Sequence, residues 1–416
     1  MGGCVSGTAE PTTARALLTD RAFLVALAIA VVVALGFGLV VPVLPLFARS
    51  FGVSLFAASA LVGVFAGVRL VSNFFTGALS DRIGTRRAIS WGAFIVAVSS
   101  VLAGLAPTYA ALVLLRGVGG FGSALFFNAL LAHVILIVPA DYRGRAVGLL
   151  QGAFLFGILF GPTVGGALAE PLGLRWPLII YGGFCVAAGV VALAGLPRAE
   201  GSSPSGLGGP RATWRAARHL LTVPAFVAAL VMTAAARWSA TGVRFSLVPL
   251  YGEEVVLAST LAVGFALTLS SVAHAATLWP AGRTIDRFGR RSLAAPAYLA
   301  FAAASAALVW ADTVPLFLVV MVAYGVGSGL TSVTPPAIVG DVTPPEDTGK
   351  AVGVLNTAGD LGSVAGPLVS GWLATEVGFA AAFWAAAALL ALAAVVAAPM
   401  RETLPTARAG RTGPAG

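Results

Sequence analysis

Charged side chains are scarce in this chain. Asp, Glu, Lys and Arg make up 10% of its 416 residues, against about 25% in an average soluble domain. So few charges cannot cover the surface of a soluble globule. The apolar share of 58% also excludes a disordered chain, because disordered segments are poor in apolar residues. The composition therefore predicts an integral membrane protein.

Cysteine clusters and nucleotide-binding patterns are missing as well. Cys4 and Cys185 lie far apart in the sequence, which provides neither a disulfide framework nor a metal site. Gly349-Lys350 is followed by Ala351, so the phosphate-binding loop of ATP-driven pumps is absent. We expect no enzyme, no metal and no other cofactor, and a gradient rather than ATP as the source of energy. The net charge of +9 lies in short turns between apolar runs, which indicates membrane topology and not nucleic-acid binding.

Long apolar runs are what the chain has instead. A membrane-spanning helix needs about 20 mainly apolar residues. Runs of this kind, separated by Gly, Pro or charged turns, lie at about 22–46, 55–78, 88–106, 109–137, 145–168, 177–197, 223–249, 257–280, 293–311, 314–339, 350–373 and 379–399. The sequence therefore predicts an all-α integral membrane protein with twelve transmembrane helices.

The distribution of Lys and Arg predicts the orientation. If the N-terminus lies in the cytoplasm, 19 of these residues fall in inner segments and only Arg49 and Arg175 in outer loops, as the positive-inside rule requires. An even number of spans then places both termini in the cytoplasm. The chain has 24 Arg and a single Lys, which together with its many Ala and Gly residues indicates a bacterial genome. We expect a monomeric, multi-pass protein of the bacterial inner (plasma) membrane.

The chain divides into two similar halves. Residues 198–222 are rich in Gly, Ser and Pro and then basic, which is typical of a linker. We expect tails at 1–20 and 400–416, and six-helix bundles at 21–197 and 223–399, joined by this cytoplasmic linker. The halves repeat at an offset of 205 residues, with 12 identities in 25 between 144–168 and 349–373. Two similar halves that flank a central path are typical of a transporter.

The turn after the second span recurs in the second half. Its residues are Gly77, Asp81, Arg82, Gly84, Arg86 and Arg87, and in the second copy Gly282, Asp286, Arg287, Gly289 and Arg291. Gly77 would allow close helix contact, and Gly84 would supply a tight turn. Asp81 lies at a helix end, where it can pair with an Arg or meet a helix N-terminus. Because such a pair can break and re-form, we predict a gating turn.

The fifth span carries a pattern of small residues. It consists of Gly148, Gly157, Gly161, Pro162, Gly165 and Gly166. Gly157, Gly161 and Gly165 are four residues apart and share one helix face, which predicts close packing. Pro162 removes a backbone hydrogen bond and is expected to bend the helix.

Two further patterns complete a resemblance. Leu35-Gly36 and Pro42-Val43-Leu44-Pro45 end the first span, and Arg116 precedes Gly119-Gly120 in the fourth. Together with the gating turn and the fifth span, these patterns resemble the major facilitator superfamily, in particular its twelve-span drug:proton antiporters. The resemblance covers about residues 20–400.

The resemblance implies two pseudo-symmetric six-helix bundles around a cavity that opens alternately to each side. It implies that Asp81 and its arginines stabilise one of these states, that the fifth span seals the halves against each other, and that Arg116 takes part in proton handling. The chain departs from the pattern at two points. Gly119 stands where a polar residue is common, and the first span lacks the acid that many drug exporters carry.

Ionisable residues inside spans are functional candidates, since each costs about 2.5–3.5 kcal/mol on insertion scales. Asp360 is the only acid deep in a span. A carboxyl group can take up and release a proton, whereas Arg stays charged. Our hypothesis is that Asp360 carries a coupled proton and that Arg116 tunes a proton path. A fixed Arg–Asp pair that holds helices together is the alternative.

Polar and aromatic residues within the spans are candidates for a substrate cavity. They are Arg69, Gln151, Arg237, Asn356, Phe37 and Trp238. We expect a secondary active transporter that exports a drug-like compound or a natural product in exchange for protons by alternating access. Its partners are then a small-molecule substrate, protons and the lipid bilayer. The alternatives are a proton-coupled symporter or uniporter for a nutrient, and a membrane enzyme or sensor that transports nothing.

Overall fold

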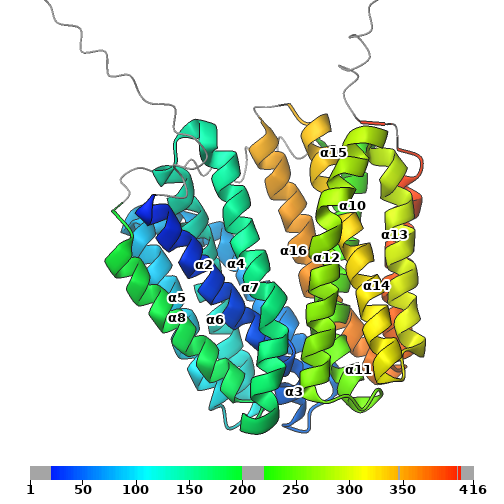
Figure 1. The fold of residues 1–416 in the computed structure, drawn as a ribbon, viewed down its shortest axis with the longest axis horizontal. Coiled ribbons are helices and arrows are strands. Elements are labelled where there is room, and N and C mark those ends of the chain that lie inside the picture. The colour runs from blue at the N-terminus through cyan, green and yellow to red at the C-terminus, as the bar shows by residue number, and fades with distance from the viewer. Residues whose placement is uncertain (1–19, 199–219, 345–346, 401, 404–416) are drawn as a thin grey trace, which may run out of the picture.

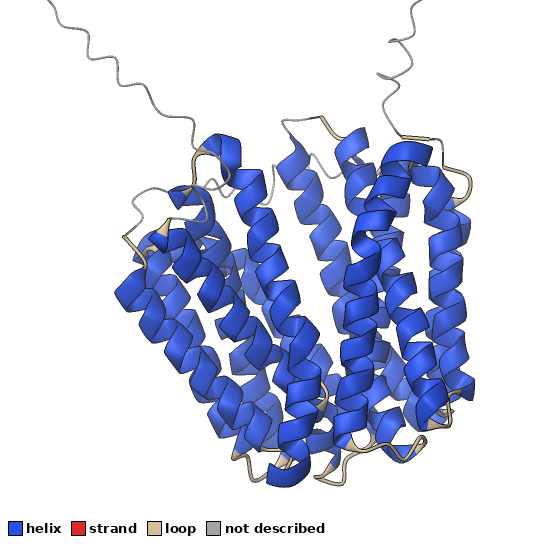
Figure 2. Cartoon of the chain, in the orientation of Figure 1, coloured by secondary structure: helices blue, strands red, loops and turns tan. Residues whose placement is uncertain are grey.

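The computed structural model describes residues 20–198, 220–344, 347–400 and 402–403 (Figure 1). Their regular structure is entirely helical (Figure 2). A backbone in lipid has to satisfy its own hydrogen bonds, and a helix does so within one segment. The predicted all-α membrane fold is therefore confirmed. The predicted tails at 1–20 and 400–416 and the linker at 198–222 fall almost wholly outside the described residues.

The first half of the chain forms one bundle. Its helices are α2 (Arg21–Val40), α3 (Val43–Arg49), α4 (Leu55–Ile83), α5 (Thr85–Gly104), α6 (Tyr109–Ile137), α7 (Arg143–Leu172) and α8 (Trp176–Gly195), with a short 3-10 turn η1 (Ala140–Tyr142) before α7. α5 packs on α6 and α8, and α2 packs on α7 and α8. α2 and α3 together make up the first predicted span.

The second half forms the other bundle. Its helices are α10 (Pro224–Trp238), η2 (Ser239–Leu247), α11 (Val248–Glu254), α12 (Thr260–Phe288), α13 (Arg290–Ala307), η3 (Leu308–Trp310), α14 (Val314–Ser332), α15 (Thr334–Val342), α16 (Thr348–Glu376) and α17 (Phe379–Ala397). The seventh span, which the sequence predicts as one plain run, consists of α10, a π-helix at η2 and α11.

Eleven helices among the described residues are long and apolar enough to cross a membrane. Four of the eleven combine two or more of the segments named above. α16 has 29 residues and is long enough too, but it carries Asp360 and is less apolar. It packs on α4 of the first half and on α10 of its own half. The eleven helices and α16 match the twelve predicted spans.

The internal repeat extends to the helix ends. Ser54 caps α4 and Ser259 caps α12, each accepting a hydrogen bond from a backbone N–H three residues on. Gly84 and Gly289, which end these helices, have φ angles of +83° and +92°, a conformation that glycine adopts without strain. The two halves meet where α4 packs on α16 and where α7 packs on α12. These two contacts are equivalent under the repeat.

Candidate functional site

The contacts between the halves concentrate toward the end of the molecule that holds α3 and α11, at the bottom of Figure 1. A Cβ added to Gly166 of α7 would come within 3.0 Å of Leu261 Cα of α12, and one at Gly371 of α16 would come within 2.5 Å of Ser59 Cβ of α4. Gly166 and Gly371 are equivalent under the repeat. Small residues thus let the two halves approach backbone to backbone.

Three polar contacts close this end, and we call them the outer seam, after the side to which the predicted topology assigns this end. Arg49 Nε of α3 lies 2.7 Å from Glu254 Oε1 of α11, two residues that are 205 positions apart. The backbone N–H of Phe56 donates to Thr375 Oγ1 at 2.7 Å, and that of Leu261 donates to Glu170 Oε2 at 3.3 Å. The last two bonds are also copies of each other, since their donors and their acceptors occupy equivalent repeat positions. The outer seam therefore follows the pseudo-two-fold symmetry of the fold.

The predicted gating turns lie at the opposite end, where the helices of the two halves diverge (Figure 1). No atom other than those of the surrounding helix lies within 4 Å of a Cβ built at Gly77 or Gly282. The close helix contact predicted at Gly77 is therefore wrong for this conformation, because the halves are apart there.

The acidic residues of the turns contact only their own half. Asp286 Oδ1 lies 3.1 Å from Arg290 Nη1, and Arg290 Nε lies 2.9 Å from Asp341 Oδ2 of α15. Asp81 is exposed and forms no ion pair with any described residue. The expected pairing of Asp81 is thus not formed in this conformation. Arg86 of the same turn bonds the backbone oxygen of Leu196 at 3.5 Å, again within the first half.

The glycine pattern of α7 divides between two neighbours. A Cβ at Gly157 would come within 2.5 Å of Leu35 N, and those at Gly161 and Gly165 would overlap Gly38 and Leu39, all on α2.

This face therefore packs within the first half, and only the face with Pro162 and Gly166 meets α12, where a Cβ at Gly264 would overlap the Pro162 backbone. The expectation that the whole pattern seals the two halves is corrected to that second face. Gly148 has open space at its Cβ position.

Asp360 lies at the contact between the halves. Asn73 Nδ2 of α4 donates to Asp360 Oδ2 of α16 across 3.4 Å. Asn128 of α6 bonds Asn73 Oδ1 at 3.1 Å and Thr76 Oγ1 at 2.8 Å. Asn73, Thr76 and Asn128 were not among the predicted site residues, and their signal in the sequence is that they are polar residues within apolar runs. This network connects the carboxylate of the second half to two helices of the first.

Two arginines accompany Asp360, and neither is Arg116. Arg69 of α4 interacts electrostatically with Asp360 and with Arg237 of α10. A Cβ at Gly359, next to Asp360, would lie 3.2 Å from Arg237 Cγ. The polar neighbours of Arg116 are Tyr181 and Cys185 instead. Arg116 is therefore not the arginine that lies near Asp360 in this conformation.

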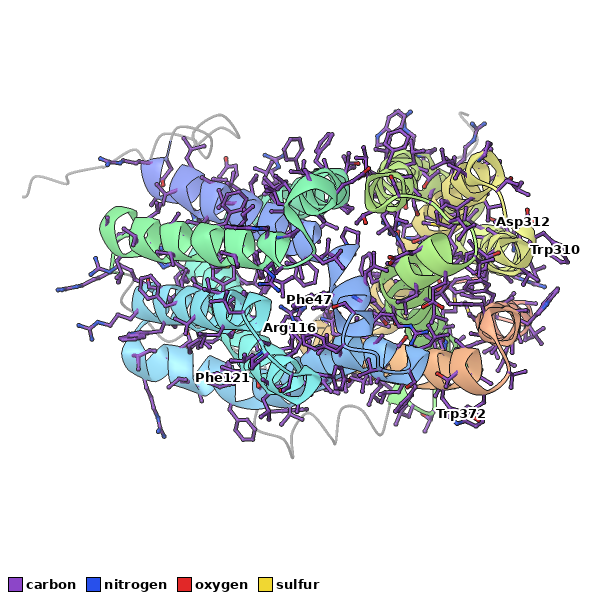
Figure 3. All side chains as sticks on the ribbon, turned by 90° about the horizontal axis from the view of Figure 1, so that it is seen from below. Phe47, Arg116, Phe121, Trp310, Asp312 and Trp372 are labelled. Carbon is purple, nitrogen blue, oxygen red and sulfur yellow. The ribbon has the colours of Figure 1, made fainter. Side chains whose placement is uncertain are left out.

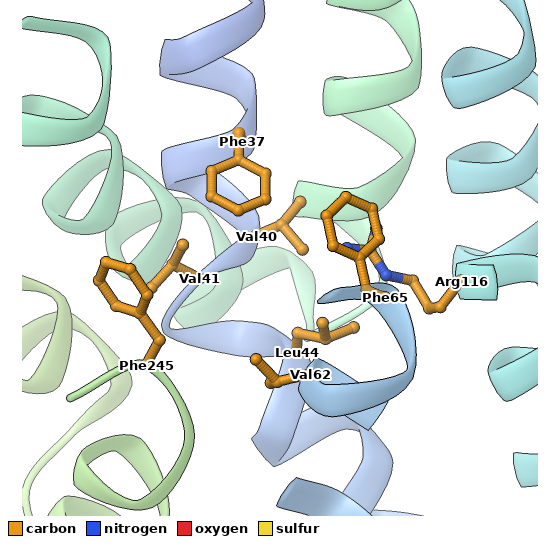
Figure 4. A pocket seen from close by; sticks show the side chains of 8 residues that line it. All are labelled: Phe37, Val40, Val41, Leu44, Val62, Phe65, Arg116 and Phe245. Carbon is orange, nitrogen blue, oxygen red and sulfur yellow. The ribbon is translucent and has the colours of Figure 1, made fainter. Parts of the chain in front are cut away.

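Arg116 lines a small cavity between the halves (Figure 4). The cavity measures about 40 Å³ and is otherwise lined by apolar side chains: Phe37, Val40, Val41, Leu44, Val62, Phe65 and Phe245. Phe245 comes from η2 of the second half. Viewed from below, Arg116 and Phe47 lie toward the middle of the molecule, whereas Trp310 and Trp372 lie at its periphery (Figure 3).

The other predicted cavity residues are dispersed. Phe37 lines the cavity and packs on Phe65, with ring centroids 6.1 Å apart. Gln151 and Asn356 are exposed, and Asn356 lies one helical turn before Asp360. The Trp238 indole N–H has no hydrogen-bond partner among the described residues.

Comparison with known proteins places the chain among transporters. It is similar to Multidrug resistance protein 2 of Bacillus subtilis (strain 168), 30% identical over 171 residues, or 41% of this chain and 42% of the relative. It is also similar to Quinolone resistance protein NorA of Staphylococcus aureus (strain Mu50 / ATCC 700699), 26% identical over 172 residues, or 41% of this chain and 44% of that protein. These alignments span less than half the length of the curated relatives.

Solved structures share the fold over most of the chain. A D-xylose-proton symporter superposes with a TM-score of 0.71 at 20% identity, covering 92% of this chain and 99% of that one. The human organic anion transporter MFSD10 (TETRAN) superposes with a TM-score of 0.65 at 20% identity, covering 91% and 99%. The family model of the Major Facilitator Superfamily matches residues 26–259 and 238–415. With two pseudo-symmetric helical bundles and matches over nearly its whole length, this chain belongs to the Major Facilitator Superfamily, a family of multi-pass membrane transporters and not of enzymes.

Proposed function

We propose that this chain exports a drug-like compound or natural product from the bacterial cytoplasm in exchange for protons, with both termini inside. The placement of Asp360 carries the proposal. It is the only carboxylate in the middle of a described transmembrane helix, and it bonds Asn73 of the other half. A protonatable group at the contact between two moving halves is what coupling requires.

The physical basis of the coupling is the charge of Asp360. As a carboxylate, it attracts Arg69 of the first half and accepts the hydrogen bond of Asn73. Protonation removes this charge and leaves Arg69 opposite Arg237, which carries the same sign as Arg69. The contact between α4 and α16 is then less stable relative to the states in which these helices are apart. A proton thus shifts the equilibrium between conformations because it interacts differently with each of them.

The open end fits the proposed direction of transport, and the relatives support it. The halves are in contact at the outer seam and diverge at the end with the gating turns (Figure 1), so this conformation is the one that would take up cargo from the cytoplasm under the predicted topology. Both curated relatives are named for resistance to drugs, and efflux is how a transporter gives resistance.

Transport in reconstituted liposomes tests the proposal. Purified protein would be placed in sealed vesicles with an imposed pH gradient, while cationic, neutral and anionic compounds are added one at a time and the internal pH is followed with a dye. We expect at least one compound to move against the proton flow. Cargo that moves together with protons would overturn export by exchange and show symport.

Asp360→Asn tests the coupling itself. The amide keeps the shape and the bond to Asn73 but cannot take up a proton. We expect loss of uphill transport, by about tenfold or more, while downhill exchange of labelled cargo continues. Glu376→Gln is the matched control, since this exposed acid lies on the same helix, and it should transport normally. Uphill transport that persists in Asp360→Asn contradicts the role of Asp360.

A further inference from the structure

The cavity beside Arg116 holds one charged group among apolar walls. Seven apolar side chains and the Arg116 guanidinium line it, and Arg116 is 2% exposed. Its guanidinium carbon lies 4.5 Å from the centre of the Phe65 ring, with the side chain reaching toward the cavity (Figure 4). Such a cation–π contact stabilises the charge only modestly.

The charge of Arg116 has no counter-ion among the described residues. No carboxylate of the described residues pairs with it, and its Nε lacks a hydrogen-bond partner. Tyr181 and Cys185, its polar neighbours, are uncharged groups at neutral pH. Removing one partner of a buried pair is strongly destabilising, because a buried charge is left uncompensated. One cation–π contact offsets only part of the free-energy cost of burying this charge. We therefore infer that the missing partner is an oxygen acceptor.

We propose that this cavity is a subsite for the carboxylate, or a comparable oxyanion, of an otherwise apolar cargo. The planar guanidinium offers several N–H donors in a fixed fork that matches two carboxylate oxygens. The volume of about 40 Å³ fits a head group and not a whole drug-sized molecule, whose sites measure about 300–1,000 Å³. The inference rests on the proposed transport function and names its cargo class.

The cavity is assembled from both halves. Phe245 of η2 contributes one wall, and the remaining residues belong to α2, α3, α4 and α6 or the turn between α2 and α3. It therefore has all its walls only while the halves meet near the outer seam. When they separate there, the wall formed by Phe245 moves away and water reaches Arg116. The bound anion would then be exposed to the outer side, which is the place of release in export.

Binding to the purified protein tests the subsite without any gradient. Calorimetric titration would compare 2-naphthoate, 2-naphthamide and 2-naphthylmethylammonium, which share one ring system and differ in the head group. We expect naphthoate to bind at least tenfold more tightly than the ammonium compound, with the amide between them. An ammonium compound that binds as tightly as naphthoate overturns the proposal.

Substitutions assign the preference to Arg116. Arg116→Met should weaken naphthoate binding at least tenfold and leave the ammonium compound unchanged or bound more tightly, and Arg116→Lys should fall between. Arg283→Met is the control, because Arg283 also lies over an aromatic ring, that of Trp279 at 3.4 Å, but is exposed. An unchanged preference in folded Arg116→Met contradicts the proposal.

Phe245→Ala covers the case in which Arg116→Met does not fold. Opening that wall should weaken all three compounds and keep their order, whereas unchanged binding of all three places the ligands elsewhere and overturns the subsite. The outcome is separable from that of the proposed function. Naphthoate preference without proton exchange would refute exchange and leave the subsite standing, and proton exchange with ammonium preference would do the reverse.

Discussion

At the scale of single residues, glycines on one helix have opposite surroundings. A Cβ at Gly161 of α7 would overlap the Gly38 backbone of α2, whereas one at Gly152, further toward the gating-turn end, would meet nothing within 4 Å. The first glycine is required by packing in this conformation. The second is not, and it lies outside the glycine pattern predicted for this span.

This difference predicts two stabilities. Gly161→Ala should lower the free energy of unfolding by about 1–3 kcal/mol, the usual cost of overpacking. Gly152→Ala should keep or raise it, because Ala in a helix interior is favoured over Gly by about 0.5–1 kcal/mol. The fraction of each variant that stays monodisperse after heating in detergent measures the difference. Equal melting of the two variants would show that α2 and α7 do not pack as closely as described.

The sequence identifies the rare charged residue within a span, but it does not identify the common uncharged polar residues that contact it. Asp360 could be singled out from sequence because a carboxylate is costly within an apolar run. Asn73 and Asn128 could not, since uncharged polar residues recur in transmembrane helices and their partners lie on helices far apart in sequence. Arg116 was assigned to the proton path by the resemblance of the fourth span, and that role stays a prediction. The structure adds that Arg69 is the arginine that interacts with Asp360.

At the scale of elements, the seventh span differs most from its prediction. Hydropathy predicts one continuous helix, but residues 239–247 form a π-helix, a rare form that is frequent at functional sites. Hydropathy cannot distinguish a π-helix from an α-helix, because the two differ only in the spacing of backbone bonds. Phe245, which walls the Arg116 cavity, lies within this segment.

The ion pair between α3 and α11 predicts a measurable shift between conformations. Arg49→Ala or Glu254→Ala removes one contact of the outer seam, and exposed pairs of this kind contribute about 0.2–1 kcal/mol. We expect labelling of Val40→Cys, beneath the seam, by a membrane-impermeant reagent from outside to rise by up to about fivefold. The exchanged pair Arg49→Glu with Glu254→Arg should restore slow labelling. If it labels as fast as the single variants, the pair does not stabilise the closed end.

At the scale of the whole molecule, the twelve-span architecture was predictable, because length, hydropathy and the repeat all indicate it. The conformation was not. Both the gating turns and the outer seam consist of contacts that form in one state and are lost in another, and a sequence specifies both states. In this conformation the gating turns therefore lack the contacts predicted for them. The outer seam, which no sequence motif predicts, holds the two halves together at the other end.

The predicted orientation in the membrane has a direct test. Leu257, in the connection from α11 to α12, is 81% exposed, and Gly144 lies at the start of α7 with open space around it. In intact cells an impermeant maleimide should label Leu257→Cys and should label Gly144→Cys only after permeabilisation. The parent for both carries Cys4→Ser, and Cys185 is buried. The reverse pattern would invert the topology and with it the proposed direction of transport.

The ion pair of the outer seam also has a consequence for the origin of the chain. Two residues that are equivalent under a two-fold axis and touch each other lie next to that axis, so in a dimer of identical subunits each would face its own copy. Two arginines or two glutamates would then repel. Arg49 against Glu254 is therefore a contact that could arise only after duplication, once each half had its own coding sequence and the two were free to diverge.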